Sequence, residues 1–179
     1  MKFFFINILF VLLSACALEG ANVIGPAGGF VFYDKGNYND GWRYLEASPI
    51  DAGSVGYSFL LGEVTGTSAS IGMGKQNTDI ILALINANED DNGVGNAAKL
   101  CSEFHFGGYN DWFLPSENEL EQMIKTAKYS FEERNKKNIY LTSTLYRRSE
   151  SEGVVRSYFR IVNTEQSSGS AQIRPARRF

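Results

Sequence analysis

The chain has 179 residues, of which 44% are hydrophobic and 13% aromatic, and its formal net charge at pH 7 is -3. This composition excludes an intrinsically disordered chain, which lacks enough apolar surface to bury. The mildly acidic balance argues against general nucleic-acid binding, which relies on a basic surface. The length suits a single domain with a sizeable hydrophobic core.

The first 15 residues have the pattern of a bacterial signal peptide. Lys2 supplies a positive charge, and residues 3–13 are apolar but too few to span a bilayer, which takes about 20 residues. Small residues then lead into Cys16, as in a lipobox that is cleaved before the cysteine and lipidated on it. The alternative is an ordinary signal peptide with an incidental cysteine. The favoured interpretation predicts a protein held in the membrane by acyl chains on Cys16.

The residues after Cys16 set the expected location and tether. Ala17 stands where an Asp would signal inner-membrane retention in enteric bacteria, so we expect a lipid-anchored protein of the cell envelope, at the outer membrane. Residues 16–23 hold the lipidated cysteine and a linker of about 20 Å. Residues 24–179 form the domain. The one other cysteine, Cys101, lies in an apolar helical pattern, which predicts a buried thiol without a disulfide.

The domain opens with a predicted hairpin. Residues 28–34 and 42–47 have the composition of strands, and a turn-rich cluster of Gly, Asn and Asp separates them. Residues 49–70 follow, rich in Gly and Ser and poor in helix signals. This stretch predicts a long and partly irregular loop, and loops of that length are often functional or mobile.

Two helices are expected next. Asn77 or Thr78 is placed to cap the first of them. The Gly-x-Gly-Lys sequence at residues 72–75 does not predict a phosphate loop, because Gln76 follows where Ser or Thr is required, so the glycines are expected to shape the turn into the helix. The second helix covers residues 94–104 and is predicted to end at Gly107.

Metal and cofactor chemistry has little support in the sequence. Residues 89–93 form an acidic turn in which Asp90 and Asp91 could hold calcium, but the ligand spacing of calcium loops is missing. A solvated turn between helices is the favoured interpretation. His105 is the only histidine and has no second His or Cys near it, so a zinc site lacks a ligand set. The sequence predicts no bound metal and no cofactor.

The central stretch, residues 107–120, combines several structural signals. Trp112-Phe113-Leu114 predicts a short buried strand that ends at Pro115. Ser116 and Glu119 have the spacing of a capping box and predict the start of a third helix. Helix end, buried strand and helix start therefore meet at Trp112, whose ring is expected in the core.

Two polar residues flank this tryptophan on its N-terminal side. Asn110 and Asp111 follow two glycines, as turn-forming residues often do. We expect their side chains to cap the turn through hydrogen bonds to the backbone. Binding of a ligand or a cation is the less favoured alternative.

The last third of the chain contains the strand patterns and most of the arginines. Residues 139–144 predict one strand, residues 154–162 alternate as a second, and residues 171–174 are expected to return beside it as a hairpin. The candidate ligand-binding residues of this region are Arg156, Tyr158, Arg160, Arg174 and Arg178. Guanidinium groups suit sulfate, carboxylate or phosphate. The alternative is that these arginines pair with neighbouring glutamates such as Glu150, Glu152 and Glu165.

Four segments together carry a family resemblance. The central stretch Gly-Gly-Tyr-Asn-Asp-Trp-Phe-Leu-Pro-Ser-x-x-Glu-Leu, with residues 24–33, 71–78 and 174–179, resembles the C-terminal domain family of the Legionella collagen-like protein. The segments occur in the family's order and cover nearly all of the predicted domain. The resemblance implies an α+β fold of the C-type-lectin-like kind, with antiparallel hairpins and two or three helices. In some members it also implies adhesion to sulfated polysaccharide.

Three functional hypotheses follow. The favoured one is a non-catalytic surface lipoprotein whose domain binds an anionic polysaccharide or another surface partner, and no nucleic acid. The second is a structural envelope module, possible also as a homo-oligomer. The third is an enzyme, because related lectin-like folds include formylglycine-generating enzymes. Their oxidative chemistry uses cysteine, and only Cys101 would be available here.

Overall fold

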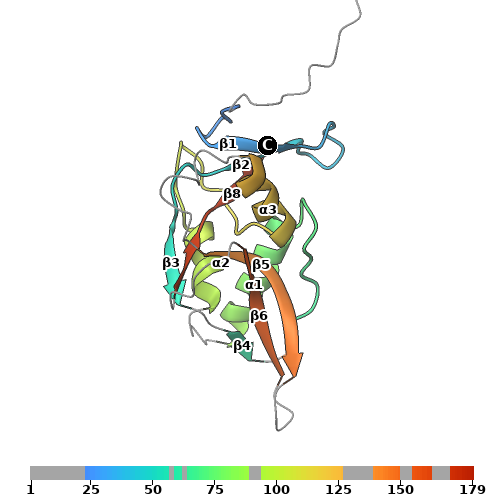
Figure 1. The fold of residues 1–179 in the computed structure, drawn as a ribbon, viewed down its shortest axis with the longest axis vertical. Coiled ribbons are helices and arrows are strands. Elements are labelled where there is room, and N and C mark those ends of the chain that lie inside the picture. The colour runs from blue at the N-terminus through green and yellow to red at the C-terminus, as the bar shows by residue number, and fades with distance from the viewer. Residues whose placement is uncertain are drawn as a thin grey trace, which may run out of the picture.

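The computed structural model describes residues 23–56, 59–61, 64–88, 94–126, 139–149, 155–162 and 170–179 (Figure 1). The predicted signal peptide, Cys16 and the linker up to residue 22 lie outside these residues, as does the acidic turn at 89–93. The described elements are β1 (Phe30–Asp34), β2 (Tyr44–Ala47), β3 (Gly53–Gly56), β4 (Phe59–Leu61), α1 (Gly74–Asn88), α2 (Val94–Ser102), α3 (Glu117–Thr126), β5 (Tyr140–Ser149), β6 (Val155–Val162), β7 (Ser170–Ile173) and β8 (Ala176–Arg178).

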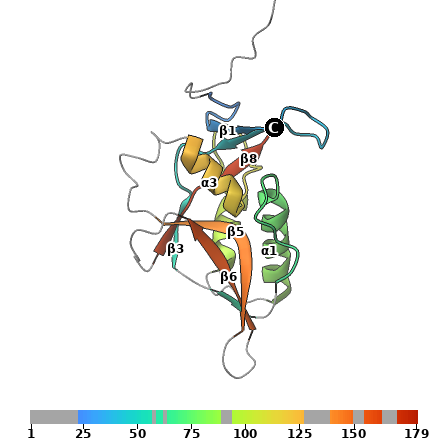
Figure 2. The ribbon, with the colours of Figure 1, turned by 45° about the vertical axis from the view of Figure 1, so that its right-hand side comes forward.

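These elements confirm the expected α+β class. Within the described residues the strands form a three-stranded sheet of order β1-β2-β8 and a five-stranded sheet of order β3-β7-β5-β6-β4. The predicted opening hairpin is confirmed, because β1 pairs with β2 in antiparallel register from Phe30 opposite Ala47 to Asp34 opposite Tyr44. The three-stranded sheet and α3 lie at one end of the molecule, and the far ends of β5 and β6 project from the other (Figures 1 and 2).

Two strand assignments differ from the sequence-based expectation. The chain was expected to fold residues 171–174 back beside β6, but β7 pairs with β3 and with the start of β5. In this position Ala171 and Ile173 are buried in the core, which removes their apolar surface from water. The stretch 49–70, expected to be irregular, supplies β3 and β4, which are the two edge strands of the same sheet.

The hydrophobic core has two parts. The first lies between the five-stranded sheet and helices α1 and α2, and includes Ile81, Cys101 and Leu114. The second lies between the three-stranded sheet, α3 and the start of β5, and includes Phe113 and Tyr140. Successive side chains of the central stretch therefore enter different parts of the core.

Trp112 is buried as expected, with 2% of its surface exposed. Its ring makes edge contacts with the rings of Phe104 and Phe106, at centroid distances of 5.7 Å and 6.4 Å. The segment is buried but does not form a strand, because only Phe113 pairs, with Ala176 of β8. The next hydrogen-bonded position of such an antiparallel pair would be Pro115 opposite Arg174, and Pro115 has no N–H to donate.

The capping box at the start of α3 is confirmed. The Ser116 N–H donates to Glu119 Oε2 at 2.7 Å, and the Glu119 N–H donates to Ser116 Oγ at 3.3 Å. The other oxygen of Glu119 accepts from the N–H groups of Gly72 and Gly74, at 2.8 Å and 3.3 Å. One fully buried carboxylate thus holds the starts of two helices. Burial raises the pKa of Glu119, and the backbone donors act in the opposite direction.

This carboxylate explains the Gly-x-Gly-Lys sequence. A Cβ at Gly74 would overlap the Glu119 carboxylate, so only glycine leaves room for it. Helix α1 begins at Gly74 rather than at the expected cap, Asn77 or Thr78. Both of those residues lie inside the helix and are buried. Asn77 bonds to Ser68 and Ser143, and Thr78 bonds to the backbone of Leu114.

A glycine turn follows α2. Helix α2 ends at Ser102, earlier than the expected end at Gly107, and Phe106 and Tyr109 then pair around Gly107 and Gly108. Both glycines have positive φ, 62° and 83°, as a tight two-residue turn requires. A Cβ at Gly107 would overlap the backbone carbonyl of Ala27, whereas a Cβ at Gly108 meets nothing within 4 Å.

These two glycines form a matched pair for a stability test. Gly108→Ala should lower the free energy of unfolding by about 1 kcal/mol, because alanine is strained at positive φ. Gly107→Ala carries the same strain and also pushes against Ala27, so its loss should reach about 3 kcal/mol or more. Urea unfolding of both variants measures the difference. Equal losses would show that the approach to Ala27 imposes no constraint.

Candidate functional site

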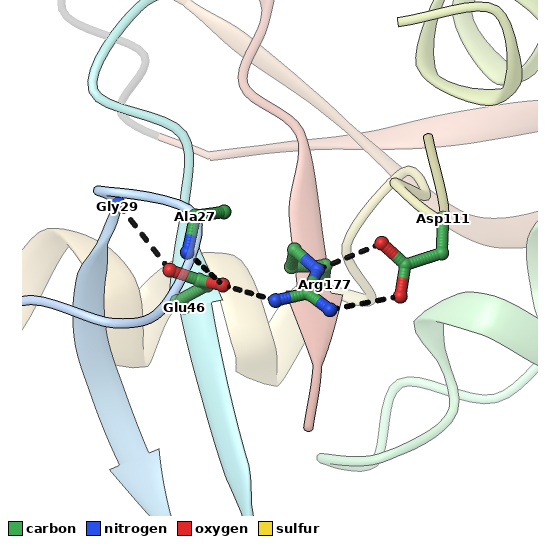
Figure 3. Close-up of polar contacts among 5 residues, drawn as sticks. All are labelled: Ala27, Gly29, Glu46, Asp111 and Arg177. Atoms are coloured by element: carbon green, nitrogen blue, oxygen red, sulfur yellow. Dashed lines mark hydrogen bonds and ion pairs between the residues drawn. The ribbon is translucent and has the colours of Figure 1, made fainter. Parts of the chain in front are cut away.

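A buried ion network joins the opening, central and closing segments of the domain (Figure 3). Arg177 of β8 donates from Nη1 to Glu46 Oε1 at 2.5 Å. Its Nε and Nη2 donate to the two carboxylate oxygens of Asp111, at 2.7 Å and 3.0 Å. Glu46 is fully buried and Arg177 is 4% exposed, so the network belongs to the interior. Asp111 lies at its more solvent-accessible end.

Glu46 also fixes the turn that opens the domain. Its carboxylate accepts hydrogen bonds from the N–H groups of Ala27 and Gly29, at 3.3 Å and 3.2 Å. A Cβ at Gly25 would overlap this carboxylate, and one at Gly29 would overlap the carbonyl of Ala47. The glycines of the opening segment therefore allow the turn to pack directly against β2.

The contacts of Arg177 indicate that the network has a structural role rather than a ligand-binding one. Burial works against the charge of Arg177, but the hydrogen bonds to Asp111 and Glu46 prevail and raise the pKa of the guanidinium. The ring of Tyr109 lies 3.8 Å from the guanidinium carbon of Arg177 and contributes a cation–π contact. Asp111 was expected to cap a turn, or less plausibly to bind a ligand. Its carboxylate instead forms an ion pair with Arg177.

Arg174, a predicted binding residue, is also part of the interior. Its Nε donates to Asp51 Oδ1 at 2.6 Å, and its Nη1 donates to the carbonyl oxygen of Ser48 at 3.3 Å. The residue is only 3% exposed. The expectation that Arg174 belongs to an exposed basic surface is therefore wrong, because its guanidinium ties the β3 side of the fold to the segment between β7 and β8.

The other predicted binding residues lie on two different sheets. Arg178 is exposed on β8, opposite Leu45 in the three-stranded sheet. Arg156, Tyr158 and Arg160 lie on β6, whose backbone is described while its side chains are not. Strand β6 pairs with β4 and β5, so β8 does not extend its surface. Arg178 is therefore not brought beside the β6 residues.

The pairing of β5 with β6 adds residues to the predicted set. Tyr146 lies opposite Tyr158, and Arg148 lies opposite Arg156. Directly opposed residues share a face of an antiparallel sheet, and alternate residues along one strand share it too. We call the set Tyr146, Arg148, Arg156, Tyr158 and Arg160 the arginine–tyrosine face.

The side chain of Tyr146 shows how this face is oriented. Tyr146 is 42% exposed, whereas the preceding residue, Leu145, packs against the core on the opposite side of the sheet. Tyr146 therefore faces outward, and of the other four residues of the set only the backbone is described. This end of β5 and β6 projects away from α3 and the three-stranded sheet (Figure 2). The sequence pattern found the alternation on β6 but not the partner strand that brings in Arg148.

Cys101 and His105, which were considered for catalysis or metal binding, lie in the core and at the surface. Cys101 is fully buried, and burial strongly raises the pKa of its thiol. His105 is exposed after α2, and its Nδ1 contacts the carbonyl oxygen of Glu103 at 2.7 Å. Among the described residues, no three His, Cys, Asp or Glu side chains are grouped to hold a metal ion. The acidic turn with Asp90 and Asp91, where calcium binding was the less favoured alternative to a solvated turn, lies outside that part of the chain.

Comparisons with known proteins add no relatives. The chain matches no protein-family model, no curated protein and no solved structure. Of the helices in the described residues, none is long and apolar enough to cross a membrane.

Neighbouring arginines on β8 test the ion network. Arg177→Ala leaves Glu46 buried without its counter-charge, so we expect the free energy of unfolding to fall by about 3–5 kcal/mol. Arg178→Ala removes the same charge from an exposed site and should change it by about 0.5 kcal/mol or less. Urea unfolding at pH 7 compares the two. Similar losses would contradict the structural role given to Arg177.

Proposed function

We propose that this chain is a lipid-anchored, non-catalytic binding protein of the bacterial cell envelope, and that it adheres to anionic polysaccharide through the arginine–tyrosine face. The observation that carries the proposal is the strand register, which places Arg148 opposite Arg156 and Tyr146 opposite Tyr158. The register thus sets arginine and tyrosine positions beside one another in a protein whose formal net charge is negative.

Arginines at directly opposed positions lower the stability of the strand pair unless an anion lies between their guanidinium groups. Like charges directly opposite each other destabilise an antiparallel pair. A sulfate or carboxylate that bridges Arg148 and Arg156 would relieve this repulsion, and guanidinium groups are well shaped to bind such groups with two hydrogen bonds. The neighbouring tyrosines add ring faces and hydroxyl groups, which suit the apolar faces and hydroxyls of sugar rings. These features favour an acidic glycan over a neutral one at this face.

The C-type-lectin-like fold is part of the proposal and is supported by where the resemblance motifs meet. The opening, central and closing segments converge on Glu46, Arg177 and Asp111. The segment 71–78 meets the central stretch at Glu119. Motif residues that hold a scaffold together are typical of a shared fold, so the resemblance supports the fold more directly than it supports any ligand.

The expected alternatives have weaker support. A structural or oligomeric envelope module would not need opposed arginines on an outward face. An enzyme of the formylglycine-generating kind needs a reactive cysteine, and Cys101 is enclosed in the core with its thiol pKa raised by burial. The envelope location itself rests on the sequence around Cys16, and an outer-membrane position rests on Ala17.

Heparin, a sulfated polysaccharide, tests the binding face. The full chain in lipid nanodiscs should bind heparin at low salt and release it as salt screens the charges. The double variant Arg148→Gln/Arg156→Gln should weaken the apparent affinity by about tenfold or more, equivalent to about 1.4 kcal/mol. Calorimetric titration at two salt concentrations measures both effects.

A charge-matched variant controls this experiment. Lys75→Gln/Lys99→Gln removes the same number of positive charges from helices α1 and α2, where both lysines are at least partly exposed. It should bind heparin about as well as the unaltered chain. No binding at low salt would remove the anionic-glycan proposal, and equal weakening by both double variants would attribute binding to net charge rather than to this face.

Cys16→Ser tests the anchor separately. Without the thiol no acyl chain can be attached, so we expect the protein to move from the membrane fraction to the soluble fraction of cells that express the full chain. Mass spectrometry of the unaltered protein should find acyl groups on Cys16. An unmodified Cys16, or a variant that stays in the membrane fraction, would contradict the lipoprotein assignment.

A further inference from the structure

A second candidate site lies at the end of the molecule opposite the arginine–tyrosine face. It is a pocket of about 430 Å³ between the opening segment, β1, the end of α3 and Phe179. These elements lie together at the top of Figure 1, far from the projecting ends of β5 and β6. The side chains that give the pocket its character are Ile24, Tyr33, Asp34, Tyr44, Gln122 and Phe179. A volume of several hundred cubic ångströms is ordinary for a small-molecule site.

Hydrogen bonds hold the walls of the pocket in place. The carbonyl oxygen of Phe179 accepts from the N–H groups of Arg43 and Tyr44, at 2.8 Å and 2.9 Å. The side chains of Gln122 and Thr126 each donate to the carbonyl oxygen of Phe32 at 3.4 Å, which fastens α3 to β1. Because the walls are fixed before any ligand arrives, little conformational entropy would be lost on binding.

The chemistry of the lining combines aromatic faces with uncharged polar groups. The rings of Tyr44 and Phe179 are stacked, with centroids 5.3 Å apart and an interplanar angle of 29°. Gln122 and Thr126 add an amide and a hydroxyl to the lining, where Gln122 Nε2 donates to Thr126 Oγ1 at 2.9 Å. A sugar ring has an apolar C–H face that packs on aromatic rings and hydroxyls that bond to such side chains.

The charge of the pocket indicates a different class of ligand from the one proposed for the arginine–tyrosine face. Asp34 is the one charged side chain among the described lining residues. It forms two hydrogen bonds with Arg43, at 2.7 Å and 2.9 Å, and this contact lowers the pKa of Asp34. The carboxylate is therefore ionised and already balanced. The side chains of the described lining therefore offer an incoming anion no cation, and their one carboxylate is already paired.

We infer that this pocket binds a neutral sugar residue of hexose or N-acetylhexosamine size, with one ring face against Tyr44 and Phe179 and its hydroxyls toward Gln122 and Thr126. The site is independent of the proposed anionic-glycan face, since the two share no residue. Together they would let one domain contact an acidic and a neutral part of the same or different glycans.

Saturation-transfer NMR tests this inference on the full chain in lipid nanodiscs. The probes are the methyl glycosides of glucose, galactose and N-acetylglucosamine. At least one should receive saturation, strongest at the C–H groups of one ring face. Phe179→Leu keeps an apolar side chain but removes the ring, and should weaken the apparent affinity by tenfold or more. Phe179→Tyr keeps the ring and should retain binding.

Two further variants complete the test. Gln122→Leu removes the amide at similar volume and should also weaken binding, which keeps the inference testable if Phe179→Leu melts below the assay temperature. Ile50→Ala alters an exposed apolar residue outside the pocket and should change nothing. No transfer to any of the three glycosides would overturn the inference, as would transfer that persists in both Phe179→Leu and Gln122→Leu. Either result leaves the heparin experiment unaffected, because that experiment alters other residues.

Discussion

The ion network of Glu46, Arg177 and Asp111 is the constraint on which the rest of the fold depends. Arg177 is separated by 131 residues from Glu46 and by 66 from Asp111, so the network forms only when both ends of the domain are in place. Desolvation offsets much of the attraction within such a buried group, so its net contribution to stability is small. Its effect is on specificity, because any other arrangement of these segments leaves Glu46 buried without a partner.

Glu119 plays a similar part between the helices. It caps α3 through Ser116 and at the same time accepts hydrogen bonds from Gly72 and Gly74 at the start of α1. Each of the two buried carboxylates thus lies against a glycine-rich backbone that leaves no room for a side chain. At both places glycine leaves space for the carboxylate, and backbone N–H groups donate the hydrogen bonds that water cannot supply there.

Features set by neighbouring residues could be predicted from the sequence, and features set by distant ones could not. The capping box lies within residues 116–119 and the β1–β2 hairpin closes around residues 35–43, so both were visible as local patterns. Arg174 was misplaced because its partner, Asp51, lies 123 residues away. The residues opposite β6 depend on an irregularity in β5 between Leu141 and Leu145, which no periodic pattern indicates.

The arginines fall into classes that differ in what they can bind. Arg174 and Arg177 are buried themselves and are paired with carboxylates, so an incoming anion would have to displace a fixed ion pair. Arg43 is balanced by Asp34 at the surface. For Arg148 and Arg156 the register sets the two backbone positions opposite each other, while their side chains and the glutamates that could pair with them, Glu150, Glu152 and Glu165, lie outside the described part of the chain. Like charges at opposed positions break a local rule of strand pairing, and positions that break a local rule are where function is expected. That contrast within a single residue type is the strongest argument for an anionic ligand at this face.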